Sequence, residues 1–82
     1  MKTHYVYILQ SINHLGQFYT GLTNDVPDRL AAHNAGQSTH TAKYKPWRVL
    51  SAHYFADPQT AAAFERYLKT GSGRAFASKH LR

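Results

Sequence analysis

Four side chains between residues 7 and 33 could together act on a phosphodiester. Tyr7 and Tyr19 lie in two short apolar runs, and Arg29 and His33 lie one turn apart in the helix pattern that follows. A guanidinium can neutralise phosphate charge, and an imidazole can transfer protons near neutral pH. A phenol can act as a base if nearby cations lower its pKa from about 10. If the two runs pair as a hairpin, the set is suited to phosphodiester hydrolysis.

Each of these residues also has an ordinary interpretation. The two tyrosines could form a cross-strand aromatic pair with hydroxyls that face solvent. Arg29 could be a solvated helix residue, or a phosphate clamp without a catalytic role. His33 follows Leu30 by three positions and could be a packing histidine. None of the four is specific alone, so their meaning depends on the elements that hold them.

Glu65 is the only glutamate in the chain, and it is the one carboxylate that no helix cap explains. The other carboxylates, Asp25, Asp28 and Asp57, lie at predicted helix N-termini. Glu65 lies in the middle of a helix, on the shoulder of an apolar stripe. There it could form a surface ion pair with Lys69 or bind a divalent metal. A single Mg²⁺, with Mn²⁺ as the alternative, could be held by one carboxylate, waters and a substrate phosphate.

The composition favours a polyanionic partner. The chain has 82 residues, so we expect one domain over residues 1–82. Its net charge is +6, with ten lysines and arginines against four acidic residues. Aromatic residues are interleaved with the basic ones, as in nucleic-acid interfaces. We expect phosphate contacts from Lys43, Lys45, Arg66, Lys69 and Arg74.

Several other classes of protein are excluded. The chain has no cysteine, which rules out disulfides and thiolate metal sites, and its six histidines lack zinc-ligand spacing. No run approaches the ~18 apolar residues that a membrane span needs. The first residues carry no signal-peptide pattern, so we expect a cytoplasmic protein without a membrane partner.

The predicted order of elements is β-β-α-β-α-α. Strands are expected over residues 4–10, 17–23 and 47–56. A hairpin register in which paired residue numbers sum to 26 places Tyr7 opposite Tyr19 and Ile8 opposite Phe18, with the tyrosines on the face away from Val6 and Ile8. In the third strand, strict alternation puts Val49, Ser51, His53 and Phe55 on one face and Leu50, Ala52 and Tyr54 on the other.

Helix signals follow the strands. Asn24 or Asp25 can cap the first helix, Pro27 suits its first turn, and Gly36 ends it. Residues 37–46 show no periodicity and are predicted to be a loop. Asp57 and Pro58 start a second helix that runs to about residue 70, where two glycines end it. Its apolar stripe is Ala61, Phe64 and Leu68, and a third helix over residues 74–81 closes the chain through Phe76 and Leu81.

Together these residues resemble the GIY-YIG nuclease superfamily, in particular its short single-domain bacterial members. The first signature reads Val6-Tyr7-Ile8, and the second reads Tyr19-Thr20-Gly21, with ten residues between them. The helix over residues 28–36 resembles the segment after the second signature, and Glu65 matches the glutamate of the next helix. The tail over residues 69–76 also resembles the short members. Val6 and Thr20 stand where the signatures have glycine and isoleucine.

The resemblance implies an α+β fold, with a small three-stranded antiparallel sheet flanked by helices. It also implies Mg²⁺-dependent hydrolysis of nucleic-acid phosphodiesters, with DNA as the expected substrate, by in-line attack of water. In this family pattern Tyr7 would position or activate water, and Tyr19 would contact the water or the phosphate. Arg29 would stabilise phosphate charge, His33 would assist proton transfer, and Glu65 would hold the metal. Which of Tyr7, Tyr19 and His33 is the base stays open.

A second hypothesis is a nucleic-acid-binding module without catalysis. Many active members of the family have an asparagine after the glutamate helix, whereas no asparagine follows Asn34 here. Such a module would use tyrosines as stacking platforms and basic side chains as phosphate contacts. No separate DNA-binding domain is recognised in the 82 residues, so a partner protein could supply specificity. An exposed strand edge could also pair two copies as a homodimer.

Overall fold

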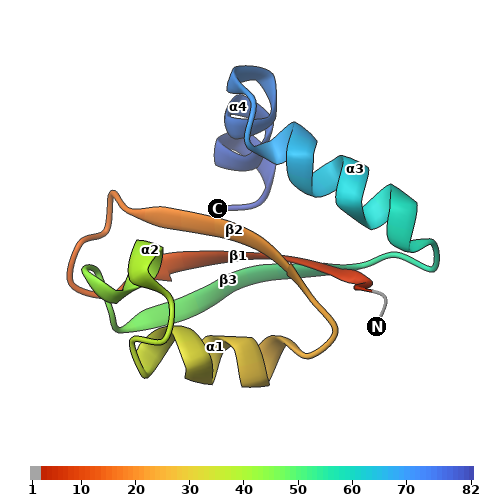
Figure 1. Cartoon of the computed structure of the whole chain (residues 1–82). Helices are drawn as coiled ribbons and strands as arrows, with labels where there is room; N and C mark the ends of the chain where they lie inside the picture. Colours follow the sequence, from red (N-terminus) through yellow and green to blue (C-terminus); the bar gives the residue numbers. More distant parts are fainter. Residues whose placement is uncertain (1–2) are drawn as a thin grey trace.

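The computed structural model describes residues 3–82, and Met1 and Lys2 of the predicted domain lie outside the described residues. A three-stranded antiparallel sheet of order β2-β1-β3 carries helices on both faces (Figure 1). The strands are β1 (Tyr5–Ser11), β2 (Phe18–Thr23) and β3 (Trp47–Tyr54). The helices are α1 (Val26–Asn34), α2 (Thr39–Ala42), α3 (Pro58–Leu68) and α4 (Gly71–His80). This confirms the predicted α+β class and the order of the main elements.

The central strand β1 supplies both halves of the core. Its alternating side chains point to opposite faces of the sheet. On one face Val6 and Ile8 pack against α3 and α4 through Ala61, Leu68 and Ala77. On the other face a second cluster gathers under α1, built from Tyr7, Leu9 and Trp47 with Val26 and Leu30 against them. Figure 1 shows α1 and α2 on one side of the sheet and α3 and α4 on the other. No helix in residues 3–82 is long and apolar enough to cross a membrane.

The predicted hairpin register is wrong by two residues. Tyr7 pairs with Gly21, and Tyr19 pairs with Leu9, so paired numbers sum to 28 instead of 26. Likewise Phe18 lies opposite Gln10 and not opposite Ile8. A shift of two keeps every side chain on its predicted face, because the side-chain period of a strand is also two. Tyr7 and Tyr19 therefore still share a face, as diagonal neighbours.

The predicted faces of the third strand are wrong at Val49 and Leu50. A β-bulge interrupts the pairing of β1 with β3, so Ile8 pairs with Ser51 while Leu9 pairs with Val49. The extra residue breaks strict alternation. Val49 consequently joins the Tyr7 cluster, and Leu50 packs with the cluster under α3. The strand also ends at Tyr54, two residues earlier than expected.

The predicted cap of α3, Asp57, is confirmed, and of the two residues predicted for α1, Asn24 and Asp25, the structure uses Asp25. The Asp25 side chain accepts a hydrogen bond from the Asp28 N–H, and Asp57 accepts from the Gln59 N–H, both at 3.0 Å. Gly36 follows α1 with φ of +77°, a left-handed conformation that glycine adopts without strain. Residues 37–46, predicted to be a loop, contain the short helix α2. A four-residue helix is too short to show periodicity in the sequence.

The last helix begins three residues earlier than predicted. The Thr70 hydroxyl accepts a hydrogen bond from the Gly73 N–H at 3.1 Å, so Thr70 is its N-cap and the two glycines lie inside its first turn. Gly73 packs so closely on α3 that a Cβ there would overlap the Tyr67 carbonyl. Because this contact sets the helix orientation, Ala77 is buried, whereas Phe76, predicted to close the chain, is 37% exposed.

Candidate active site

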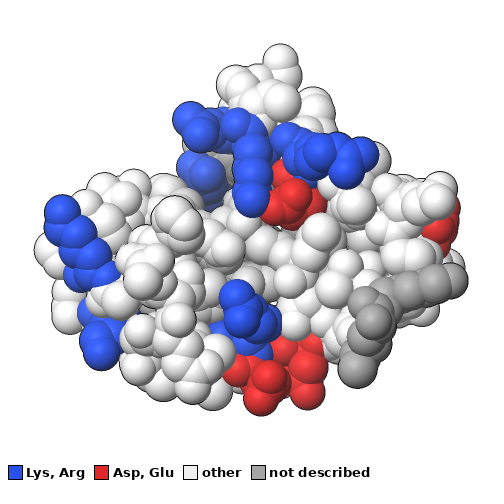
Figure 2. Space-filling view, viewed as in Figure 1, with Lys and Arg blue, Asp and Glu red and all other residues white. Residues whose placement is uncertain are grey.

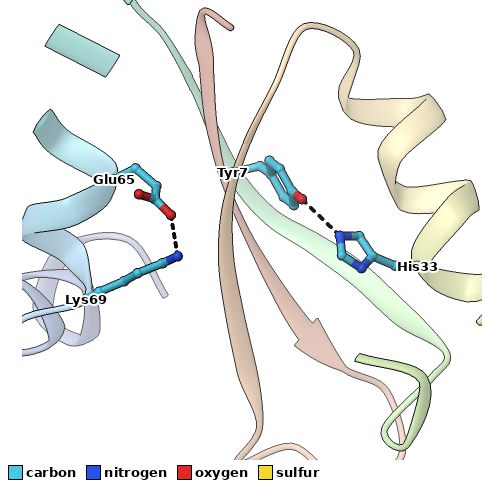
Figure 3. A network of polar contacts seen from close by, with 4 residues as sticks. All are labelled: Tyr7, His33, Glu65 and Lys69. Atoms are coloured by element: carbon cyan, nitrogen blue, oxygen red, sulfur yellow. Dashed lines mark hydrogen bonds and ion pairs between the residues drawn. The ribbon is translucent and has the colours of Figure 1, made fainter. Parts of the chain in front are cut away.

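A buried chain of hydrogen bonds runs from the central strand into α1 and α2. The Tyr7 hydroxyl lies 2.9 Å from His33 Nε2 (Figure 3). On the other side of the ring, His33 Nδ1 lies 2.7 Å from Thr41 Oγ1. All three side chains are buried, with exposures of at most 1%. Thr41 also donates its hydroxyl proton to the Ser38 carbonyl at 3.5 Å. Its oxygen is therefore the acceptor for a proton on His33 Nδ1, which leaves Nε2 to accept the proton of Tyr7.

His33 is held as a neutral base. Burial, and second the charge of Arg29, lower the pKa of His33 below its usual value of about 6.5. Its helix is fixed to the sheet by Asn34, whose side-chain amide pairs with the backbone N–H and C=O of Trp47. Neutral imidazole is the form that can take a proton from a phenol, so the geometry and the charge state of His33 agree.

The two phenols occupy different environments. Burial raises the pKa of Tyr7, and interaction with Arg29 opposes this by favouring the phenolate. Tyr19 is only partly buried at the edge strand β2, with its ring centroid 4.9 Å from that of His33 and 6.2 Å from that of Tyr7. Interaction with the Tyr7 hydroxyl in turn raises the pKa of Arg29, which stays a cation. The structure therefore brings all four predicted catalytic residues together.

Gly21 makes the position of the Tyr7 ring possible. It pairs with Tyr7 across the two strands, and the ring lies directly over its backbone. A Cβ at residue 21 would stand 2.5 Å from the Tyr7 hydroxyl oxygen, 2.7 Å from its Cζ and 3.0 Å from Tyr19 Cε2. Only glycine leaves room for both rings, which gives the glycine of the second signature a steric role.

Glu65 lies on the other side of the sheet edge. Figure 3 shows the Tyr7 hydroxyl directed toward His33, with Glu65 and Lys69 on the α3 side. Glu65 is 13% exposed and forms an ion pair with Lys69, which is 53% exposed. The charge of Glu65 still reaches Tyr7 and contributes to raising its pKa. The ordinary interpretation of Glu65, an i to i+4 pair, is thus observed in this structure.

The side chains around Glu65 fit a hard divalent cation that takes most of its oxygen ligands from water and substrate. Within residues 3–82, no three His, Cys, Asp or Glu side chains gather into a metal site. One carboxylate, Glu65, is directed from α3 toward the strands (Figure 3). Mg²⁺ in proteins commonly keeps several waters and takes one or two carboxylates plus substrate phosphates. Such an ion fits at Glu65 only if Lys69 gives up the carboxylate.

The predicted phosphate contacts divide into two regions. Lys69 and Arg74 line a hollow of about 460 Å³ between β2 and the α3–α4 layer, together with Tyr19 and Arg82. Arg66 is exposed on the last turn of α3. Lys43 and Lys45 follow α2, on the α1 side of the sheet, and are exposed. The structure does not bring these two lysines to the hollow.

Two residues of this region were missed in the sequence. Thr41 lies in a segment without periodicity, so no signal pointed to it as the partner of His33. Arg82 belongs to a visible C-terminal basic cluster, but only the packing of α4 on α3 brings it beside Phe18, with its guanidinium carbon 3.9 Å from the ring centroid.

The comparison with known families decides the membership of the chain. The family described as the GIY-YIG catalytic domain matches residues 3–79. The chain belongs to the GIY-YIG family. This confirms the resemblance, and GIY-YIG domains are nuclease-type catalytic domains.

The relatives of this GIY-YIG domain carry an uninformative name. A UPF0213 protein of Lacticaseibacillus paracasei is 42% identical over 69 residues, which cover 83% of this chain and 75% of the relative. UPF0213 proteins of Xanthomonas campestris and Streptococcus pyogenes are 36% and 33% identical over 69 residues, covering 66% and 73% of their own lengths. No solved structure matches the chain. The relatives therefore support a short GIY-YIG protein without adding a substrate.

Proposed function

We propose that this GIY-YIG domain is a metal-dependent endonuclease that hydrolyses DNA phosphodiesters by in-line attack of water. The observation that carries the proposal is the buried hydrogen bond between Tyr7 and neutral His33, with the Arg29 cation beside the same phenol. A buried packing tyrosine needs an acceptor for its hydroxyl, but it does not need a guanidinium beside the same oxygen. Together the two groups stabilise the phenol as it gives up a proton.

Each residue of the Tyr7–His33 site has a distinct role in the proposed reaction. Tyr7 can pass its hydroxyl proton to His33 Nε2 and accept a proton from a water seated against its oxygen. Because Tyr7 is 1% exposed, that water must sit directly at the phenol and not in bulk solvent. Tyr19 and Arg29 are partly exposed, so they can meet the phosphate. Arg29 would stabilise the negative charge that grows on the phosphate oxygens.

Glu65 is the side chain that would hold the divalent cation. A bound Mg²⁺ would supply Lewis-acid stabilisation of the phosphate charge and of the leaving oxygen. The chemistry of the site asks for an oxygen-preferring ion, and Mn²⁺ would fit the same donors. Glu65 must exchange its Lys69 partner for this ion.

Cleavage of a labelled panel of single-stranded, duplex and branched DNA, in Mg²⁺ and in EDTA, tests the proposal. We expect cleavage only with the metal, and a loss of at least about 100-fold in Glu65→Gln, since even indirect partners of a metal site cost 10- to 100-fold. Asp57→Asn is the matched control, because it makes the same chemical change at the other end of α3 and asparagine can still cap that helix. Metal-dependent cleavage that survives in Glu65→Gln would contradict the assignment of Glu65.

A nucleic-acid-binding module is the second candidate. It is favoured by the pairing of Glu65 with Lys69, and by the lack of any cluster of three His, Cys, Asp or Glu side chains within residues 3–82. This candidate predicts tight, salt-sensitive binding without cleavage in Mg²⁺ or Mn²⁺, unchanged or strengthened in Glu65→Gln. That result would contradict the proposed endonuclease activity and support the binding module.

A further inference from the structure

The hollow between β2 and the α3–α4 layer is basic and adjoins the candidate active site. Lys69, Arg74 and Arg82 line it, and Tyr19 belongs both to its wall and to the ring cluster around His33. Figure 2 shows basic side chains gathered over α3 and α4, with acidic atoms among them. Packing on Phe18 holds the Arg82 guanidinium in place. The hollow thus offers three cations to a polyanion that passes Tyr19 toward the site.

Lys69 belongs to two sites at once. It lines the basic hollow, and it is also the ion-pair partner of Glu65. Glu65 is largely covered, whereas Lys69 is about half exposed on a long, flexible side chain. Lys69 can therefore turn from the carboxylate to a phosphate in the hollow, while Glu65 stays in place.

A divalent cation and the Lys69 ammonium compete for one carboxylate. Two cations at the same oxygen pair repel each other, so a metal at Glu65 requires Lys69 to leave. Leaving is unfavourable while no other anion is at hand. A phosphate bound by Arg74 and Arg82 supplies that anion, which lowers the cost of moving Lys69.

We propose that the hollow lined by Lys69, Arg74 and Arg82 binds a nucleic-acid phosphate, and that this phosphate draws Lys69 off Glu65 and frees the carboxylate for a divalent cation. The inference rests on the proposed function for its metal. It adds that substrate and metal bind with positive coupling. Coupling between two ligands is reciprocal, so each must strengthen the binding of the other by the same factor.

Phosphate binding in the hollow is tested without metal. A short fluorescein-labelled phosphorothioate DNA is titrated in EDTA and followed by fluorescence anisotropy. Arg74→Gln and Arg82→Gln should each weaken binding about fivefold, the upper effect for an exposed ion pair. Each should also reduce the dependence on salt by about one phosphate contact. Lys79→Gln removes one positive charge from α4 outside the hollow. If Lys79→Gln weakens DNA binding as much as Arg74→Gln or Arg82→Gln does, the hollow is not the phosphate site.

Coupling is tested by Mn²⁺ binding, read from the electron paramagnetic resonance signal of free Mn²⁺. Without DNA, Lys69→Gln should bind Mn²⁺ about fivefold more tightly than the original chain, because the competing ammonium is gone. The phosphorothioate DNA should tighten Mn²⁺ binding in the original chain and much less in Lys69→Gln. Glu65→Gln reports the background from Mn²⁺ on the DNA itself.

If the DNA tightens Mn²⁺ binding equally in the original chain and in Lys69→Gln, the proposed coupling through Lys69 is refuted. A Mn²⁺ affinity in Glu65→Gln that matches the original chain would also refute it. Coupling that is present in a chain without cleavage would support this inference and overturn the endonuclease, so the two failures can be told apart.

Discussion

Gly21→Ala is the sharpest test of the site. It adds one methyl group against the Tyr7 ring, and its effect on cleavage can be compared with its effect on stability. The added Cβ would lie 2.5 Å from the Tyr7 hydroxyl oxygen and 2.7 Å from Cζ. Real Cβ atoms do not approach so closely, so the ring must move. Tyr7 is fully enclosed by β1, β2 and α1, and any movement must stretch or break its hydrogen bond to His33.

The expected cost of Gly21→Ala follows from overpacking. Inserting a methyl group into a packed interior costs about 1–3 kcal/mol. For a domain of this size each kcal/mol lowers Tm by roughly 4–8 °C. Cleavage should fall further than stability, by at least about 100-fold, because a 1 Å displacement of a catalytic group costs about that much. Differential scanning fluorimetry and the DNA cleavage assay measure the two effects.

Gly71→Ala is the matched control, since no atom lies within 4 Å of a Cβ there and alanine suits the first turn of α4. Its Tm and cleavage should stay the same or rise slightly. Placing Gly21→Ala in a Tyr7→Phe background removes the closest clashing atom, so the two losses of stability should be less than additive. Unchanged Tm and cleavage in Gly21→Ala would refute the steric role given to this glycine.

Three further perturbations test the network around His33. Thr41→Val should leave the His33 Nδ1–H buried without an acceptor and cost about 1–3 kcal/mol, whereas Thr41→Ser should keep the hydroxyl and lose much less in a thermal melt. Because burial lowers the pKa of His33, the unfolded chain binds more protons than the folded one between that lowered pKa and about 6.5. Stability should therefore fall as the pH drops from 7 to 5. His33→Gln should flatten this fall and leave only the part due to His53, whose pKa burial also lowers; equal slopes in both chains would contradict the assignment. Arg29→Ala should lower cleavage by at least about 100-fold, with a change in stability within about 0.5 kcal/mol, and a matching collapse of the thermal transition would instead make Arg29 structural.

Local chemistry in the sequence was sufficient for the main elements. Asp57 caps α3 and Asp25 caps α1 because an aspartate at the N-cap accepts a backbone N–H and a proline suits the first helical turn that follows. Alternation along β1 placed Val6 and Tyr7 on opposite faces, since side chains of a strand can only alternate. The one-turn spacing of Arg29 and His33 likewise predicted that both side chains lie on the same helix, as they do in α1.

The sequence could not select the strand register or the faces beyond the bulge. Registers that differ by two residues bury the same side chains, so the hydrophobic pattern does not distinguish them. The pairing of Tyr7 with Gly21 depends on how the Tyr7 ring fits over a residue without a side chain. Val49 and Leu50 exchanged faces because a bulge depends on the packing of both sheet faces at once.

The sequence by itself predicted the family, the cap of α3 and the four residues that the structure brings together around Tyr7 and His33, because these predictions depend on residue type and spacing along one or two elements. Only the tertiary structure decided which groups meet across elements. It brought Thr41 to His33, Lys69 to the basic hollow beside β2, and Arg82 to Phe18. Such contacts arise from the packing of α2 against α1 and of α4 against α3, and the free energy of that packing is distributed over the whole core.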